Sequence, residues 1–110
     1  MQPNWQQRSP EIHARFLKIA RAKGHLTSEL DVLHFLALAI CGEAGELANL
    51  VKKTWRGDDI DEKRIRDEIA DIRIYLEHIC RHLGIDLDDA CEQKLEEVAA
   101  RLNAKEQNTP

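Results

Sequence analysis

Apolar residues recur along most of the chain at three- and four-residue intervals, which is the spacing of one face of an α-helix. Helix-start residues and glycines divide this pattern into four segments. We expect helices from Ser9-Pro10 to Lys23, from Ser28 to about Lys53, from an aspartate between positions 58 and 61 to Leu83, and from Asp86 to Asn103. The connections are short and no internal repeat is present, so the pattern predicts an all-α fold, an antiparallel four-helix bundle.

The length of the chain and the second segment bear on domain organisation and assembly. A chain of 110 residues has the usual size of one domain, so we expect a single domain over residues 1–110, frayed at 1–8 and 105–110. The first half of the second helix is apolar nearly all round, and such a helix needs cover on more than one side. We therefore predict a homodimer or homotetramer, with a self-sufficient monomer as the alternative.

Composition and charge exclude several classes of protein. Apolar residues make up 43% and charged residues 33%, and no apolar run is long enough to span a membrane. The net charge of −4 gives no reason to expect binding to a nucleic acid polymer or a membrane surface. The three cysteines form no CxxC pair, which disfavours a zinc site or a disulfide framework. The first residues do not resemble a secretory signal, so we expect a cytoplasmic location.

Two acidic residues lie beside the apolar stripe of the second helix. Successive residues on an α-helix are rotated by about 100°, so each side chain can be assigned an angle around the axis. With Ile40 as the centre of the stripe, Glu43 lies about 60° away and Glu46 about 120° away on the same side. One carboxylate therefore points into the predicted core and the next lies at its margin.

The third helix repeats this arrangement. With Ile72 as the centre of its stripe, Glu68 lies about 40° away and Asp71 about 100° away, again on one side. Each helix thus carries a carboxylate within its apolar face and a second one turn later. Burying unpaired carboxylates is unfavourable, and gathering four of them requires a cation.

Oxygen ligands of this kind suit Mg²⁺ or Mn²⁺, whereas zinc would normally recruit His or Cys. Two glycines, Gly42 and Gly45, flank Glu43 and weaken the helix, which close approach by another backbone or by a bulky ligand would explain. The alternative is that the four acids are ordinary edge residues paired with Lys or Arg.

These residues also carry a resemblance to a known family. Residues 42–47 (GEAGEL), followed by residues 68–71 (EIAD), resemble the ExxE…ExxD signature of the MazG-like all-α nucleoside triphosphate pyrophosphohydrolases, which include dCTP pyrophosphatases. The similarity extends from about Leu33 to Arg101 and includes Tyr75, where relatives place a nucleotide-contacting tyrosine. The resemblance implies hydrolysis of the α–β phosphoanhydride of a nucleoside triphosphate, giving a monophosphate and pyrophosphate in nucleotide-pool housecleaning.

By this resemblance the four acids would hold Mg²⁺, with Mn²⁺ as a substitute: Glu43, Glu46, Glu68 and Asp71. A marginal carboxylate that is not fully engaged as a ligand suits a general base, which favours Glu46. Five residues are candidates for binding the substrate: Tyr75, Lys53, Lys94, Arg101 and His34.

Aromatic residues are the further candidates for contacts with the base. Trp5, Phe16 and Phe35 are able to stack on a base, although the two phenylalanines equally suit the core. His78 and His82 lie four residues apart, off the apolar stripe, and we expect them on a solvated face.

Two other functions remain open. A non-enzymatic helical interaction module would use the apolar spacing only for assembly. A di-iron or di-manganese carboxylate protein would also gather acids from facing helices, but normally with Glu-x-x-His on two of them. The chain has Glu-x-x-Glu and Glu-x-x-Asp at the corresponding places.

Overall fold

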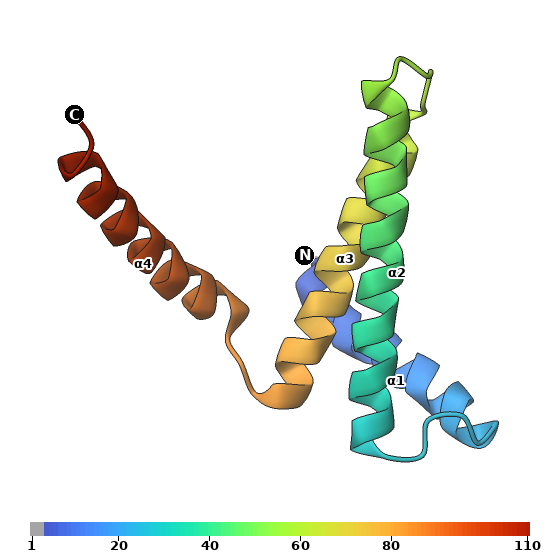
Figure 1. The fold of residues 1–110 in the computed structure, drawn as a ribbon. Helices are drawn as coiled ribbons and strands as arrows, with labels where there is room; N and C mark the ends of the chain where they lie inside the picture. Colours follow the sequence, from blue (N-terminus) through green and yellow to red (C-terminus); the bar gives the residue numbers. More distant parts are fainter. Residues whose placement is uncertain (1–3) are drawn as a thin grey trace. The chain divides into compact units, whose positions relative to one another are not determined.

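The computed structural model describes residues 4–110, and within them it contains four α-helices and no strand (Figure 1). The helices are α1 (Trp5–Ala22), α2 (Glu29–Trp55), α3 (Glu62–Leu83) and α4 (Leu87–Gln107). The predicted all-α fold is confirmed. No helix in the described range is both long enough and apolar enough to cross a membrane.

The chain divides into two compact units, Met1–Ile79 and Cys80–Pro110. In the first unit α2 and α3 lie side by side and run in opposite directions, and α1 crosses them (Figure 1). A ring contact joins α1 to α2: the Phe16 ring stacks on the Phe35 ring, with 5.4 Å between their centroids. The second unit contains the end of α3 and all of α4. A bundle with α4 as its fourth member stays a prediction.

The predicted start of α1 is wrong by five residues, because the cap is Asn4 and not Ser9. The helix begins at Trp5 because Asn4 and Gln7 form a capping box: the Gln7 amide donates to Asn4 Oδ1 (3.0 Å) and the Asn4 amide donates to Gln7 Oε1 (2.9 Å). Pro10 lies inside the helix, and Ser9 is buried rather than acting as its cap. At the other end of the chain α4 continues past Asn103 to Gln107.

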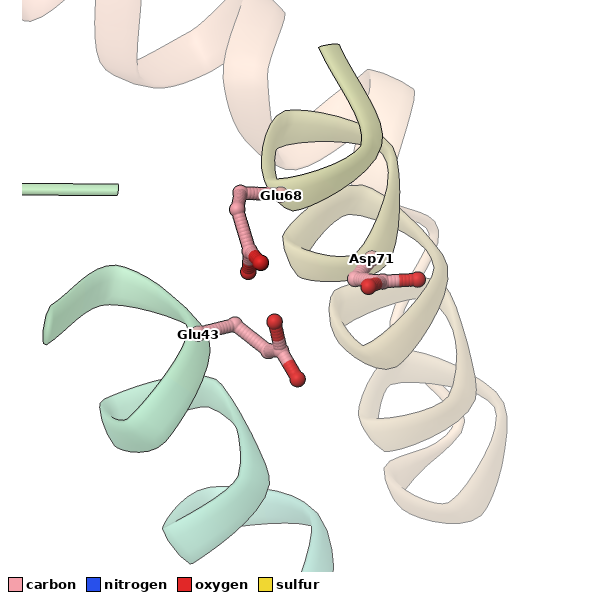
Figure 2. A group of neighbouring side chains, drawn as sticks. All are labelled: Glu43, Glu68 and Asp71. Carbon is pink, nitrogen blue, oxygen red and sulfur yellow. The ribbon is translucent and has the colours of Figure 1, made fainter. Parts of the chain in front are cut away.

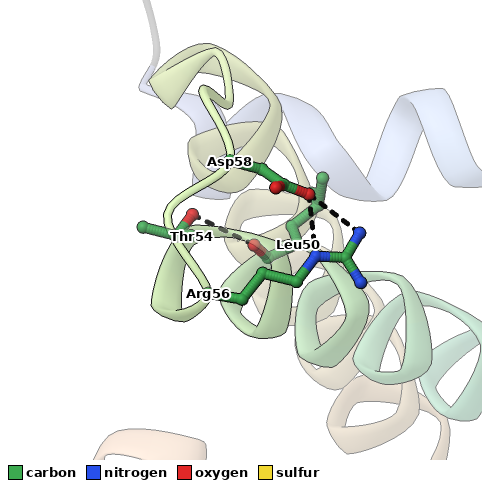
Figure 3. A network of polar contacts seen from close by, with 4 residues as sticks. All are labelled: Leu50, Thr54, Arg56 and Asp58. Atoms are coloured by element: carbon green, nitrogen blue, oxygen red, sulfur yellow. Dashed lines mark hydrogen bonds and ion pairs between the residues drawn. The ribbon is translucent and has the colours of Figure 1, made fainter.

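The ends of α2 match their prediction more closely. Ser28 caps the N-terminus, where its Oγ accepts a hydrogen bond of 3.1 Å from the Asp31 amide. At the C-terminus, Thr54 Oγ1 donates to the carbonyl of Leu50 (3.0 Å), and Arg56 pairs with Asp58 at 2.8 Å (Figure 3). Gly57 reverses the chain with φ +95°, a conformation that favours glycine. After this turn the chain runs back along α2 as α3.

The core of the first unit includes Leu36 and Leu50 of the predicted stripe of α2, but its centre is shifted around the helix from the one predicted. Val32, Leu36 and Leu50 are fully buried, together with Leu17 and Ala20 of α1. On a helical projection the three α2 residues centre about 60° from Ile40, which the sequence pattern had placed at the middle of the stripe. The reason is that α1 and α3 cover only this side of the helix in the single chain.

A neighbouring side of α2, centred about 100° around the helix from the buried residues, is apolar and open. Its groove is formed by Ala44, Leu47, Ala48, Val51 and Trp55, and we call these residues the open face. Trp55 is 87% exposed. The predicted oligomer therefore has an uncovered apolar surface available, although assembly stays a prediction. Among the described residues, a Cβ built on Gly42 or Gly45 would meet no atom within 4 Å, so the close backbone approach expected there does not occur within the chain.

Candidate active site

Three carboxylates from two helices converge in the first unit. Glu43 of α2 and Glu68 and Asp71 of α3 each offer an oxygen, and these oxygens lie within 4.8 Å of one another. We call them the carboxylate cluster. Figure 2 shows the Glu43 and Glu68 carboxylates pointing toward each other from facing helices. Both side chains are half-buried.

The position of the cluster follows from the local sequence. On α2, the angular position of Glu43 lies between those of the fully buried Leu36 and Leu50, so Glu43 lies at the middle of the buried face of the helix. On α3, Glu68 and Asp71 lie one turn apart and therefore share a side of the helix. Antiparallel packing of the two helices then brings all three carboxylates to one level.

This crowding changes the titration of the acids. A hydrogen bond with Glu43, burial, and the charges of Glu43, Asp71 and Glu46 raise the pKa of Glu68 to about 7. Burial, together with the charges of Glu43 and Asp67, raises the pKa of Asp71 above its usual value. The group is therefore unfavourable as three separate anions and would be stabilised by a bound cation.

The donor set fits a hard divalent ion. Glu68 Oε2 is buried and has no hydrogen-bond partner. In the part of the chain that the structure describes, no Lys or Arg forms an ion pair with Glu43, Glu68 or Asp71. Carboxylate oxygens without a basic partner are the ligands that Mg²⁺ and Mn²⁺ prefer, and the cluster contains no histidine or cysteine that would favour zinc.

Glu46, the fourth acid of the predicted set, lies outside this cluster. Its side chain is exposed, as its marginal angle on α2 predicts. It is nevertheless close enough for its charge to contribute to the raised pKa of Glu68. The structure thus brings together three of the four acids and leaves the fourth at the solvent side.

A pocket of about 210 Å³ adjoins the cluster and shares Asp71 with it. We call it the aromatic pocket; it is lined by Ile12, His13, Phe16, Phe35, Asp71, Ile74, Tyr75 and His78. Burial and the charges of Glu43 and Asp71 raise the pKa of the Tyr75 hydroxyl, so this tyrosine stays neutral and is available as a hydrogen-bond donor. Phe16 and Phe35, for which core and base-stacking roles were both open, are partly packed and also line the pocket.

Two histidines form one wall of this pocket. His13 and His78 stack with ring centroids 4.0 Å apart, and Tyr75 meets the His78 ring edge-on at 6.4 Å. The expectation that His78 lies on a solvated face is wrong, because α1 covers that side of α3 and leaves the residue 6% exposed. Sequence reasoning missed His13, although its spacing from Leu17 and Ala20 on the buried stripe of α1 marks it as an inward-facing residue.

The remaining candidate residues lie elsewhere. His34 is exposed on α2 and does not line the aromatic pocket, and Lys53 is half-buried near the end of that helix. Lys94 and Arg101 belong to α4 in the second unit. There Lys94 pairs with Glu97 at 3.4 Å, and Arg101 is exposed.

Comparison with known proteins supports one family. None of the curated proteins compared with this chain matches it. A family model described as the MazG-like family matches residues 27–109, a range that contains the carboxylate cluster and Tyr75. Because this match covers most of the sequence, the chain belongs to the MazG-like family.

Proposed function

We propose that the protein is a Mg²⁺-dependent nucleoside triphosphate pyrophosphohydrolase that acts on deoxynucleoside triphosphates and releases a monophosphate and pyrophosphate. One observation carries the proposal: three carboxylates without a basic partner meet beside an aromatic pocket and share Asp71 with it. Membership of the MazG-like family supports nucleotide pyrophosphohydrolase activity in general.

The residues divide into a metal-binding end and a base-binding end. Glu43, Glu68 and Asp71 would hold Mg²⁺, and Mn²⁺ would substitute because it accepts the same oxygen ligands. When bound, the metal neutralises charge on the triphosphate and lowers the pKa of coordinated water. Tyr75 and Phe16 offer ring surface to a base, since flat aromatic side chains stack on it.

The other predicted roles remain part of the proposal. Glu46 is exposed beside the cluster, so its carboxylate is accessible to accept a proton from an attacking water. Lys53 would supply positive charge for the triphosphate, and the roles expected for Lys94 and Arg101, which belong to the second unit, stay predictions. His34 would contribute a polar contact from the exposed side of α2.

We further propose that the protein is a homodimer or homotetramer built on the open face. An apolar groove with a nearly fully exposed tryptophan is costly in water, and the same face of a second copy is complementary to it. The absence of any contact at Gly42 and Gly45 within the chain leaves room for a partner helix or for substrate at that level.

The proposed reaction is tested with a panel of nucleoside triphosphates and Mg²⁺, in which pyrophosphate and orthophosphate are measured separately. Pyrophosphate release is expected. Glu43→Gln and Asp71→Asn are expected to lower kcat/KM by about a hundredfold or more, because each removes a negatively charged ligand. Both variants should keep or gain thermal stability without metal, because each relieves like-charge repulsion.

Asp67→Asn is the matched control, since Asp67 precedes Glu68 in the sequence but pairs with Lys63 at 2.8 Å on the exposed side of α3. Its activity should stay within about twofold of the wild type. Full activity in Glu43→Gln or Asp71→Asn would show that the substituted residue is not a Mg²⁺ ligand. Absence of pyrophosphate release from every nucleotide would favour the alternative, an interaction module that uses only the open face.

A further inference from the structure

The first residues of α1 contain two different helix starts. The structure uses the earlier one, in which Asn4 and Gln7 form the capping box. The residues that follow, Ser9, Pro10 and Glu11, make up a second start. Serine is a preferred N-cap residue, proline suits the first helical position, and an acid in the first turn favours the positive end of the helix dipole. A helix that begins at Pro10 is therefore also well formed.

The longer helix carries a cost at the second start. Proline has no amide hydrogen, so Pro10 donates no hydrogen bond to the carbonyl of Gln6, and its ring crowds the same carbonyl. The ring also disfavours the helical conformation of the preceding residue, Ser9, which lies inside α1. A residue before proline prefers the extended conformation, and this is also the conformation of an N-cap. Both costs disappear when the helix begins at Pro10.

The Ser9 hydroxyl adds a further cost to the longer helix. Its side chain is 7% exposed, and its Oγ has no hydrogen-bond partner among the described residues. An unsatisfied buried hydroxyl destabilises the conformation that contains it. As an N-cap, the same oxygen would accept a hydrogen bond from the amide of Glu11 or Ile12. The shorter helix thus satisfies a polar atom that the longer helix leaves unpaired.

The packing beneath residues 5–8 is incomplete. A cavity of about 170 Å³ lies against this segment, and we call it the side chamber. The side chamber is lined by Trp5, Arg8, Ser9, Ile12, Ile74 and His78. The Arg73 guanidinium lies 5.5 Å from the centre of the Trp5 ring, a cation–π contact that holds the segment on α3. Such a contact is weak at an exposed site, so the segment has low local stability.

The side chamber adjoins the proposed substrate site. It shares Ile12, Ile74 and His78 with the aromatic pocket. The aromatic pocket has a volume of about 210 Å³, whereas pockets that hold small molecules usually have about 300 Å³ or more. Departure of Trp5 and Arg8 from α3 would remove one wall of the side chamber. The residues shared with the aromatic pocket would then be accessible from this side.

We propose that α1 switches between a long form that begins at Trp5 and a short form that begins at Pro10 with Ser9 as its cap. Residues 5–8 then act as a flap that controls access to the aromatic pocket. The long form closes the site around a bound nucleotide, and the short form opens it for binding and release. The identity of the ligand rests on the proposed pyrophosphohydrolase activity, whereas the two helix starts do not.

Hydrogen exchange of backbone amides, measured by NMR on the whole chain, distinguishes this switch from fraying of a helix end. In the long form the amides of Ser9 and Glu11 bond to carbonyls four residues earlier, and the short form breaks both bonds. The His13 amide bonds to the Ser9 carbonyl in both forms. Ser9 and Glu11 should therefore exchange with one common free energy of opening, and His13 at least about tenfold more slowly. Fraying would give a gradual change along the chain.

Substitutions at the two caps should shift this exchange in opposite directions. Asn4→Ala removes the capping box of the long form and should raise the exchange rates of Ser9 and Glu11 by about fivefold. Ser9→Ala removes the cap of the short form and should lower the rate at Glu11 by about fivefold. Pro10→Ala restores the missing backbone bond and should lower both rates by more than about tenfold. Arg73→Leu removes the cation–π contact and should raise them by about two- to fivefold.

Gln6→Ala is the matched control, because Gln6 is exposed, lies in the same segment and has no side-chain role in either cap. It should change the exchange rates by less than about twofold. Coupling to the site is measured with Mg²⁺ and the α,β-methylene analogue of the nucleotide hydrolysed fastest, or of deoxycytidine triphosphate if none is hydrolysed. At saturation the analogue should favour the long form and lower both rates by about tenfold.

The outcomes are distinguishable. Changes of the same sign in Asn4→Ala and Ser9→Ala, or a gradual change from Ser9 to His13, would overturn the switch. If the two caps act oppositely but the bound analogue leaves the rates unchanged, control of the site is overturned and the proposed function stands. No binding and no pyrophosphate from any nucleotide would overturn the proposed function and the control of the site together, while opposite effects of the two caps would still support the two helix starts.

Discussion

The raised pKa of Glu68 predicts an unusual pH dependence of stability for the metal-free protein. Hydrogen bonding to Glu43, burial and neighbouring charges raise this pKa from 4.5 to about 7 in the folded state. Folding therefore binds a proton between these two values, so the contribution of Glu68 is fully present below about pH 4.5 and is lost as the pH rises through 7. The free energy of unfolding should fall over this window.

The size of the effect follows from the two pKa values. At pH 6 the folded protein binds about 0.9 more protons at this site than the unfolded chain does. The raised pKa of Asp71 also makes the folded protein less stable as the pH rises. Hydrogen bonds from Thr27 and Ser28 lower the pKa of Asp31, whose stabilising contribution is lost only as the pH falls below its ordinary value of 3.8. Asp31 therefore acts outside the window in which Glu68 titrates.

Urea denaturation in a metal chelator, at half-unit steps from pH 4.5 to 8, measures this dependence. Glu68→Gln should lose most of the slope, because the glutamine does not titrate. Glu62→Gln, which replaces an exposed acid in the first turn of α3, should retain the wild-type slope. A wild type that gains stability between pH 4.5 and 7, or an unchanged slope in Glu68→Gln, would refute the electrostatic account of the cluster.

Mg²⁺ should raise the free energy of unfolding above pH 7, where the carboxylate cluster is deprotonated and able to bind the ion. At a hundred times its dissociation constant, a ligand that binds only the folded state raises the free energy of unfolding by about 2.7 kcal/mol. This gain should be much smaller in Glu68→Gln, which has one charged ligand fewer. No stabilisation by Mg²⁺ or Mn²⁺ in the wild type would refute the metal site.

Two further predictions concern packing and assembly. Leu36→Ala should lower the free energy of unfolding by about 3 kcal/mol in urea denaturation, because Leu36 is fully buried, whereas Leu38→Ala should change it by less than about 0.5 kcal/mol because Leu38 is 72% exposed. Val51→Asp on the open face should convert an oligomer into monomers, as measured by sedimentation, and should retain the helical circular dichroism. If the wild type and the variant sediment as the same oligomer, the open face is not the interface.

Local patterns in the sequence determined the helices and much of the site. Ser28 followed by an apolar periodic run predicted the start of α2, and the glycine after Leu83 predicted the end of α3. The angular positions of Glu43 and Glu68 predicted that these acids face the core, and the spacing of Glu68 and Asp71 predicted that they share a side of α3. These properties depend only on near neighbours along the chain.

The start of α1 shows where a local pattern misleads. Ser9-Pro10 is an acceptable helix start, but Asn4 and Gln7 satisfy the free amides of an earlier start with two hydrogen bonds. Once the helix begins there, Ser9 turns inward with His13 and becomes part of the buried face. The five-residue shift of the helix cap thus turned Ser9 from an expected cap into a buried residue of the helix.

Only the tertiary structure decided which part of each apolar surface is covered. The periodic pattern of α2 spans more of its circumference than α1 and α3 cover, so the sequence predicted a stripe centred on Ile40 while packing placed Glu43 at the middle of the buried face. Packing likewise buried His78 beneath His13 and left Glu46 exposed. A helix's own sequence specifies the angles between its side chains, but the direction from which a neighbouring helix arrives depends on the whole set of packing contacts.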